Sequence, residues 1–130
     1  MKDILVPISP GELFDKITIL RIKSARMTDP AKLLNVRTEL ELLEATWRDS
    51  GCGVPEIADD EAGLQRVNEE LWDIEDRIRD QERAGQFDAQ FIALARAVYV
   101  TNDQRAAFKK RINLALGSRI VEEKSYQPYR

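Results

Sequence analysis

The chain has 130 residues, 43% of them hydrophobic and 33% charged, and a formal net charge of −3. Its length suits a single domain with a substantial core. The two signs of charge are interleaved, which excludes a general basic field that would collect nucleic acid or anionic lipid. The chain has no histidine, so the commonest general base and the commonest zinc ligand are both absent.

The single cysteine, Cys52, excludes an internal disulfide. We expect an incidental loop thiol there, because a cysteine nucleophile needs a base such as histidine. No apolar run is long enough to span a membrane, and the N-terminus has no signal-peptide core. We therefore expect a cytoplasmic protein that uses no metal or other cofactor and binds no nucleic acid.

Residues 1–8 are predicted to form an extended segment, because Pro7 interrupts a short apolar run. We expect this segment to cover one end of the core, and a short strand is the alternative. A first helix should follow Ser9, whose hydroxyl can cap it while the Glu12 carboxylate reaches back to the Ser9 amide. The helical spacing predicts an inner face of Leu13, Ile17, Leu20, Ser24 and Met27.

A second helix is predicted from about Ala31 to Asp49, with Asp29 as its cap. The turn before it is so short that the first two helices should form an antiparallel hairpin. Residues 50–59, with two glycines and a proline, are predicted to be the longest loop. The inner face of the second helix should contain Leu33, Val36, Leu40, Leu43 and Trp47.

The stretch 64–84 is predicted to be the central helix, on which the other helices pack. Asp59 or Asp60 should cap this helix and Gly85 should end it. Its apolar residues recur at alternating helical spacings, which predicts one buried face made of Leu64, Val67, Leu71, Ile74 and Ile78.

The C-terminal part is predicted to form two shorter helices, because Asn102 and Asp103 favour helix caps over helix interiors. Asp88 should cap the first of them and Gly117 should stop the second, with one kinked helix as the alternative. The tail, residues 118–130, has no helical periodicity. Three surface ion pairs at i,i+4 spacing are also expected: Glu12–Lys16, Asp73–Arg77 and Glu75–Arg79.

Together these elements predict a single all-α domain over residues 1–130, with four or five helices. An antiparallel helical hairpin should pack on the central helix and on a shorter C-terminal helix pair. Some apolar residues fall outside the predicted inner faces. A domain of this length cannot easily bury several faces of each helix, so we expect a homodimer in which the second subunit buries these residues. The alternative is that the shorter C-terminal helices and residues 4–8 bury them. The residues concerned are Ile19, Ile22, Trp72 and Val100.

Five motifs spread over nearly the whole chain carry a resemblance to a known family. They are Val6-Pro-Ile-Ser-Pro-Gly-Glu-Leu-Phe-Asp-Lys-Ile-Thr-Ile-Leu20 with Lys23, Leu71-Trp-Asp-Ile-Glu-Asp-Arg77, Phe91-Ile-Ala-Leu-Ala-Arg96 with Val98-Tyr99, Thr101-Asn-Asp103 with Arg105, and Glu122-Glu-Lys-Ser-Tyr126. The chain resembles an uncharacterised bacterial family, a domain of unknown function. The resemblance implies no established activity. It implies a link to cell-surface polysaccharide synthesis, since members of that family accompany polysaccharide and glycosyltransferase genes.

The sequence contains no Gly-rich phosphate loop, no HExxH motif and no nucleophile elbow. An active site would therefore have to be an Arg/Lys pocket that binds an anion. The run Asn68–Arg77 resembles the first helix of the helical chorismate mutases, which bind a dianion electrostatically. Ligand-binding candidates in the matched motifs are Glu12, Lys16, Lys23, Glu75, Arg77, Arg96, Tyr99, Asn102, Arg105, Lys124 and Tyr126.

For the function we favour a non-catalytic accessory or interaction protein, with a partner in a polysaccharide or glycosyltransferase pathway. The alternative is a small helical enzyme or an anionic-ligand-binding protein. An interaction protein predicts its charges on the surface beside an exposed apolar patch. An enzyme predicts buried cations facing one cavity together with Glu12 or Glu75, the cations being Lys16, Arg77, Arg96 or Arg105.

Overall fold

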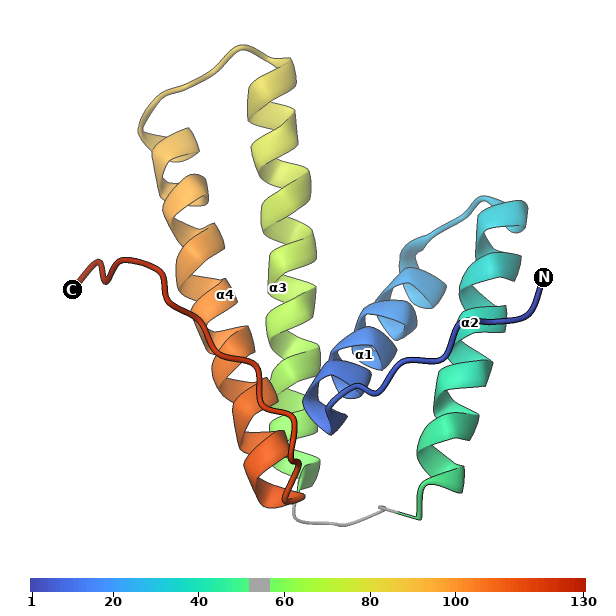
Figure 1. The fold of residues 1–130 in the computed structure, drawn as a ribbon. Helices are drawn as coiled ribbons and strands as arrows, with labels where there is room; N and C mark the ends of the chain where they lie inside the picture. Colours follow the sequence, from blue (N-terminus) through green and yellow to red (C-terminus); the bar gives the residue numbers. More distant parts are fainter. Residues whose placement is uncertain (52–56) are drawn as a thin grey trace.

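The computed structural model describes residues 1–51 and 57–130, and the described residues form four helices and no strand. The helices are α1 (Pro10–Arg26), α2 (Pro30–Asp49), α3 (Ala58–Arg83) and α4 (Ala89–Ala115). Figure 1 shows two antiparallel hairpins, α1–α2 and α3–α4, which lie close at one end and diverge toward the other. The predicted all-α class is confirmed.

The helix on which the others pack is α1, and the prediction that α3 is central is wrong. Among the described residues, α1 packs against all three other helices, whereas α2 packs only against α1. The reason is that α1 is buried on several faces: Leu13, Phe14, Ile17, Leu20 and Ile22 are all buried. Along α3, Leu64 and Val67 are buried, but the later members of the predicted face are only half-buried.

The central core lies where the two hairpins approach each other. It contains Phe14, Ile57, Leu64 and Ile112, with Trp47, Phe108 and Leu116 packed against it. The rings of Phe14 and Trp47 meet edge to face with their centroids 4.5 Å apart. Trp47 is therefore the side chain by which α2 reaches this core.

Three of the predicted helix caps are confirmed. The Ser9 hydroxyl accepts from the Glu12 amide at 3.2 Å, and the carboxylates of Asp29 and Asp88 accept from amides in the first turns of α2 and α4. The predicted cap of α3 is wrong, because α3 begins after Ile57. The predicted acidic caps, Asp59 and Asp60, instead lie in its first turn, where negative charge favours the helix dipole.

The C-terminal helix pair was predicted wrongly, because α4 is one continuous helix of 27 residues. Asn102 and Asp103 lie in its interior, and each has a tertiary role there. Asn102 lines a cleft beside α1 and α3, and Asp103 is hydrogen-bonded to Tyr129 of the tail. Local cap preference is a weak effect that such tertiary contacts override.

Two of the three predicted ion pairs are replaced by contacts between helices. The Glu12 carboxylate lies 2.8 Å from the Lys109 ammonium of α4, so it pairs neither with Lys16 nor with the Ser9 amide. The Asp73 carboxylate lies 2.6 Å from the Arg26 guanidinium instead of pairing with Arg77. The third pair, Glu75–Arg79, is confirmed at 3.4 Å.

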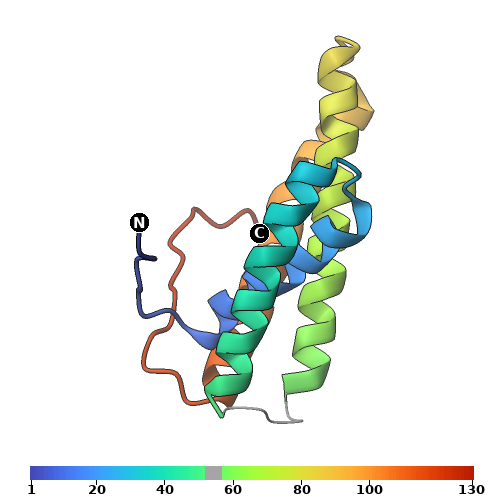
Figure 2. The same ribbon diagram turned by 90° about the vertical axis from the view of Figure 1, so that its right-hand side faces the viewer.

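Both ends of the chain are extended and run along one side of the helices (Figure 2). Ile4, Leu5 and Val6 are 78%, 90% and 64% exposed, so the N-terminal segment does not cover the core as predicted. The predicted role of Cys52 lies outside the described residues. In the described part of the chain, no helix is long and apolar enough to cross a membrane.

Candidate functional site

A buried carboxylate joins three helices. Asp15 of α1 is 2% exposed and accepts hydrogen bonds from the Arg105 Nε of α4, at 2.8 Å, and from a second nitrogen of the same guanidinium. It also accepts from the Asn68 amide of α3 at 3.0 Å. The same amide nitrogen lies 2.9 Å from the Thr18 hydroxyl. This arrangement fixes the Arg105 side chain relative to α1 and α3.

Both members of the Asp15–Arg105 pair are charged near neutral pH. Burial alone would raise the pKa of Asp15, but the hydrogen bonds and charge of Arg105, with help from Asn68, outweigh it and lower that pKa below 3.8. The hydrogen bond to Asp15 likewise raises the pKa of Arg105. A bidentate pair of this kind is strong and directional.

Lys109 connects the buried pair to the start of α1 and to the tail. Its ammonium lies 2.8 Å from Glu12, 2.9 Å from Glu122 and 4.0 Å from Asp15. Burial would lower the pKa of Lys109, but its carboxylate partners outweigh burial and raise it. Beside this junction α1 and α4 touch directly, since the Gly11 amide donates to the Asn113 side-chain oxygen at 2.7 Å.

Next to Arg105, helices α1, α3 and α4 enclose a cleft of about 390 Å³, which we call the three-helix cleft. This volume is within the range of small-molecule sites, about 300–1,000 Å³. The side chains of Lys23 and Asn102 face this cleft without a hydrogen bond or ion pair to any residue in 1–51 or 57–130. Its lining residues are Ile19, Ile22, Lys23, Asn68, Leu71, Trp72, Glu75, Asp76, Arg79, Asn102 and Arg105.

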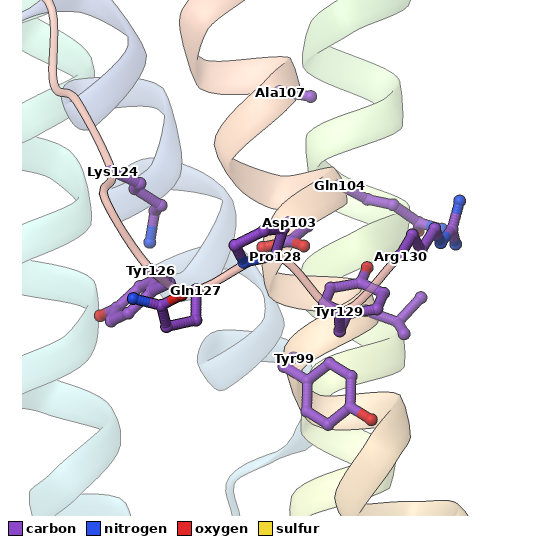
Figure 3. Close-up of a pocket in the computed structure, with 11 residues that line it drawn as sticks. Tyr99, Asp103, Gln104, Ala107, Lys124, Tyr126, Gln127, Pro128, Tyr129 and Arg130 are labelled. Atoms are coloured by element: carbon purple, nitrogen blue, oxygen red, sulfur yellow. The ribbon is translucent and has the colours of Figure 1, made fainter.

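A second space of about 810 Å³, the tail hollow, lies between α4 and the C-terminal tail (Figure 3). Tyr99 and Tyr129 close one end, with ring centroids 4.9 Å apart. Desolvation and the hydrogen bond to Asp103 raise the pKa of Tyr129. Tyr126, also on this hollow, is 81% exposed. The hollow is thus an open surface feature, and the tail beside it is tied to α4 by the Tyr129 contacts and by the ion pairs of Lys109 with Glu122 and of Lys110 with Glu123.

A third space of about 900 Å³, the N-terminal groove, lies between the N-terminal segment and α2. Its walls are mostly aliphatic: Ile4, Leu5, Val6, Ile8, Leu13, Leu42 and Leu43, together with Trp47. Four charged residues, Lys2, Asp3, Lys16 and Glu39, also line it, and none of them forms an ion pair within the described residues.

The predicted site residues do not meet in one place. Lys23, Glu75, Asn102 and Arg105 share the three-helix cleft, whereas Tyr99, Lys124 and Tyr126 line the tail hollow. Glu12 pairs with Lys109, and Lys16 lines the N-terminal groove. Arg77 and Arg96 are exposed and line none of these three spaces. Of the arrangement that an enzyme predicts, Arg105 and Glu75 line one cavity, the three-helix cleft, whereas the other cations of that arrangement lie elsewhere.

The sequence analysis missed the residues that hold the cleft together, above all Asp15. A signal was present: Gly11, Asp15, Thr18 and Ile22 follow helical spacing and form a second stripe, and all four are buried. Lys109 and the Asn68 amide were likewise not singled out as partners. A buried stripe of small and polar residues marks a helix that is covered on a second face.

The fold and the cleft define a small all-α protein of two helical hairpins with a charged site at their junction. In the described part of the chain, no group of three or more Cys, Asp or Glu side chains is arranged to hold a metal ion. The chain belongs to DUF6165, a family of unknown function whose model matches residues 4–129. No curated protein and no solved structure matches the chain.

Proposed function

We propose that this protein is a non-catalytic interaction protein that works as a homodimer, with the N-terminal groove as its contact surface. The observation that carries the proposal is the exposure of Ile4, Leu5 and Val6 beside Leu42, which is itself 53% exposed. Monomeric proteins rarely expose a contiguous apolar patch of this kind, and such patches mark interaction sites.

The charges around the groove favour a second copy of the chain as the occupant. The groove is lined by two cations, Lys2 and Lys16, and two anions, Asp3 and Glu39, all without an ion-pair partner in the described residues. A two-fold interface brings the same patch of both subunits together, so it needs a patch that is complementary to itself. Charges of both signs around an apolar centre meet that requirement. A partner with a high net charge of one sign would find no surplus of the opposite charge in this groove.

The apolar residues outside the predicted inner faces, from which the sequence predicted a dimer, do not form the proposed contact surface. Ile22 is buried within the chain, and Ile19, Trp72 and Val100 are half-buried. For the pathway, we propose a cytoplasmic accessory role beside cell-surface polysaccharide synthesis. This part of the proposal is supported by the family resemblance of the motifs alone.

The proposal can be tested with the protein's own fluorescence. The chain has two tryptophans, and Trp72→Phe leaves Trp47, which lines the groove, as the only one. We expect its emission to shift to the blue as the protein concentration rises and water leaves the groove. Leu5→Glu should abolish this dependence. Leu114→Glu, a change at a 64% exposed position of α4 outside the groove, should preserve it.

An emission that stays constant from nanomolar to high micromolar protein would contradict the dimer. Equal effects of Leu5→Glu and Leu114→Glu would contradict the groove as the contact surface.

A further inference from the structure

The three-helix cleft contains an arginine that is held in place before any ligand arrives. Two guanidinium nitrogens of Arg105 bind the buried Asp15, whose position is fixed in turn by Asn68. The Arg105 side chain remains 32% exposed and lines the cleft, so its remaining donors are available there. A side chain locked by a buried partner loses little entropy when it binds a ligand, which favours recognition.

Two further donors from different helices share the cleft with Arg105. Lys23 belongs to α1 and Asn102 to α4, and both are half-buried. Neither side chain has a partner in residues 1–51 or 57–130. Asp15 offsets the charge of Arg105, so Lys23 is the cation of the cleft that has no ion pair among the described residues, and Asp76 of α3 is the corresponding anion. An ammonium, an amide and a guanidinium facing one space fit the oxygens of a single anionic group.

On α3 the cleft is lined by two carboxylates, Glu75 and Asp76, together with the Arg79 guanidinium. Glu75 is half-buried, and its ion-pair partner is Arg79 on the same helix. A carboxylate has more acceptor sites than this one contact uses, so it can also accept from a hydroxyl or amino group. Apolar side chains that line the cleft, including Leu71 and Trp72, limit its hydration. Lys23, Asn102 and Arg105 thus supply donors from α1 and α4, while both carboxylates that line the cleft lie on α3.

We propose that the three-helix cleft binds a small molecule with a carboxylate or phosphate at one end and hydroxyl or amino groups at the other. Lys23, Asn102 and Arg105 hold the anionic group, and Glu75 accepts from the other end. The volume of about 390 Å³ is the size of a small metabolite. The cleft shares no lining residue with the N-terminal groove, so this site is independent of the proposed dimer contact.

The second tryptophan supplies a reporter for the cleft. Trp47→Phe leaves Trp72, a cleft residue, as the only tryptophan of the chain. This protein is titrated at constant ionic strength with glycerol 3-phosphate, glycerate, inorganic phosphate and glycerol, up to millimolar concentrations. We expect a saturable change of emission with glycerol 3-phosphate or glycerate, a weaker response to phosphate and none to glycerol. The tighter of the two hydroxy-anions identifies the anionic group that the site prefers.

Matched variants in the Trp47→Phe protein locate the binding. Lys23→Gln should weaken binding of the preferred anion by about tenfold or more, since it removes a charge-assisted contact. Lys32→Gln, at an exposed α2 position outside the cleft, should leave binding unchanged. Glu75→Ala, which removes the acceptor, should abolish the preference for glycerol 3-phosphate over phosphate. Asn102→Ala is a second variant among the donors and should act in the same direction as Lys23→Gln.

Three results would overturn the inference. One is a Trp72 emission that shows no saturable response to any of the three anions. The second is equal weakening of binding by Lys23→Gln and Lys32→Gln, which would indicate a general charge effect. The third is a response to glycerol as strong as that to glycerol 3-phosphate, which would show that the anionic group is not recognised.

Discussion

Replacing Asp15 by asparagine is the sharpest perturbation of the junction between the two hairpins. The change keeps the size of the side chain but removes its charge, so the Arg105 guanidinium keeps its own charge without a counterion. The carbonyl oxygen of the new amide can still accept one hydrogen bond from Arg105. The amide nitrogen takes the place of the second carboxylate oxygen and cannot accept the other hydrogen bond. The backbone of α1 should be unaffected, because asparagine is tolerated in helices at a small cost.

The expected loss follows from the burial of the pair. Removing one partner of a buried ion pair costs roughly 3–5 kcal/mol. Arg105 is 32% exposed, so water can partly replace its lost partner, and the lower end, about 3 kcal/mol, is appropriate. Domains of this size have total stabilities of about 5–15 kcal/mol, so the variant should fold but melt roughly 10–15 °C lower.

The assay is urea and thermal unfolding followed by circular dichroism at neutral pH. Asp80→Asn is the matched control, because Asp80 forms an exposed pair with Arg83 at 2.6 Å. That change should cost no more than about 1 kcal/mol. A double-mutant cycle of Asp15→Asn with Arg105→Gln should give a smaller loss than the sum of the single losses. A loss below about 1 kcal/mol for Asp15→Asn, or full additivity in the cycle, would refute the structural role of the pair.

Three more predictions follow from particular contacts. Stability should fall as the pH drops through 3.8 toward the lowered pKa of Asp15, because the unfolded chain then binds the proton more readily than the folded one. Unfolding measured across this pH range should show the loss of stability in the natural chain and a flatter dependence of stability on pH in Asp15→Asn. Gly11→Ala should destabilise the fold despite the better helix propensity of alanine, since the added Cβ would overlap the Lys109 carbonyl; a raised melting temperature would contradict this. Leu64→Ala, at a fully buried position, should lower the free energy of urea unfolding by about 2–5 kcal/mol. Leu71→Ala, at a half-buried position, should cost clearly less, and equal losses would contradict the difference in burial between the two leucines.

Features set by neighbouring residues were predicted well from the sequence. The caps at Ser9, Asp29 and Asp88 are local hydrogen bonds between a side chain and a nearby amide, so the residue types suffice to place them. The glycines after α3 and α4 are equally local, and Gly85 has the positive φ of 66° that ends a helix.

Features set by distant residues were not predictable in the same way. α4 continues through Asn102 and packs against both α1 and α3, which no local pattern shows. The partner of Glu12 is Lys109, far along the chain, and the nearby Lys16 has no pairing with it. Asp15 looks like a surface acid until Arg105 and Asn68 are brought to it by the fold. Four of the eleven candidate residues line the three-helix cleft, but no sequence pattern set those four apart from the other seven or indicated Asp15 as their support.

The proposed homodimer is the central functional claim, and sedimentation equilibrium of the unaltered chain tests it most directly. We expect a mass twice the 14.9 kDa of one chain at micromolar concentration, and a mass near 14.9 kDa for Leu5→Glu with unchanged helical content. A mass of 14.9 kDa for the unaltered chain at every concentration would rule out the homodimer.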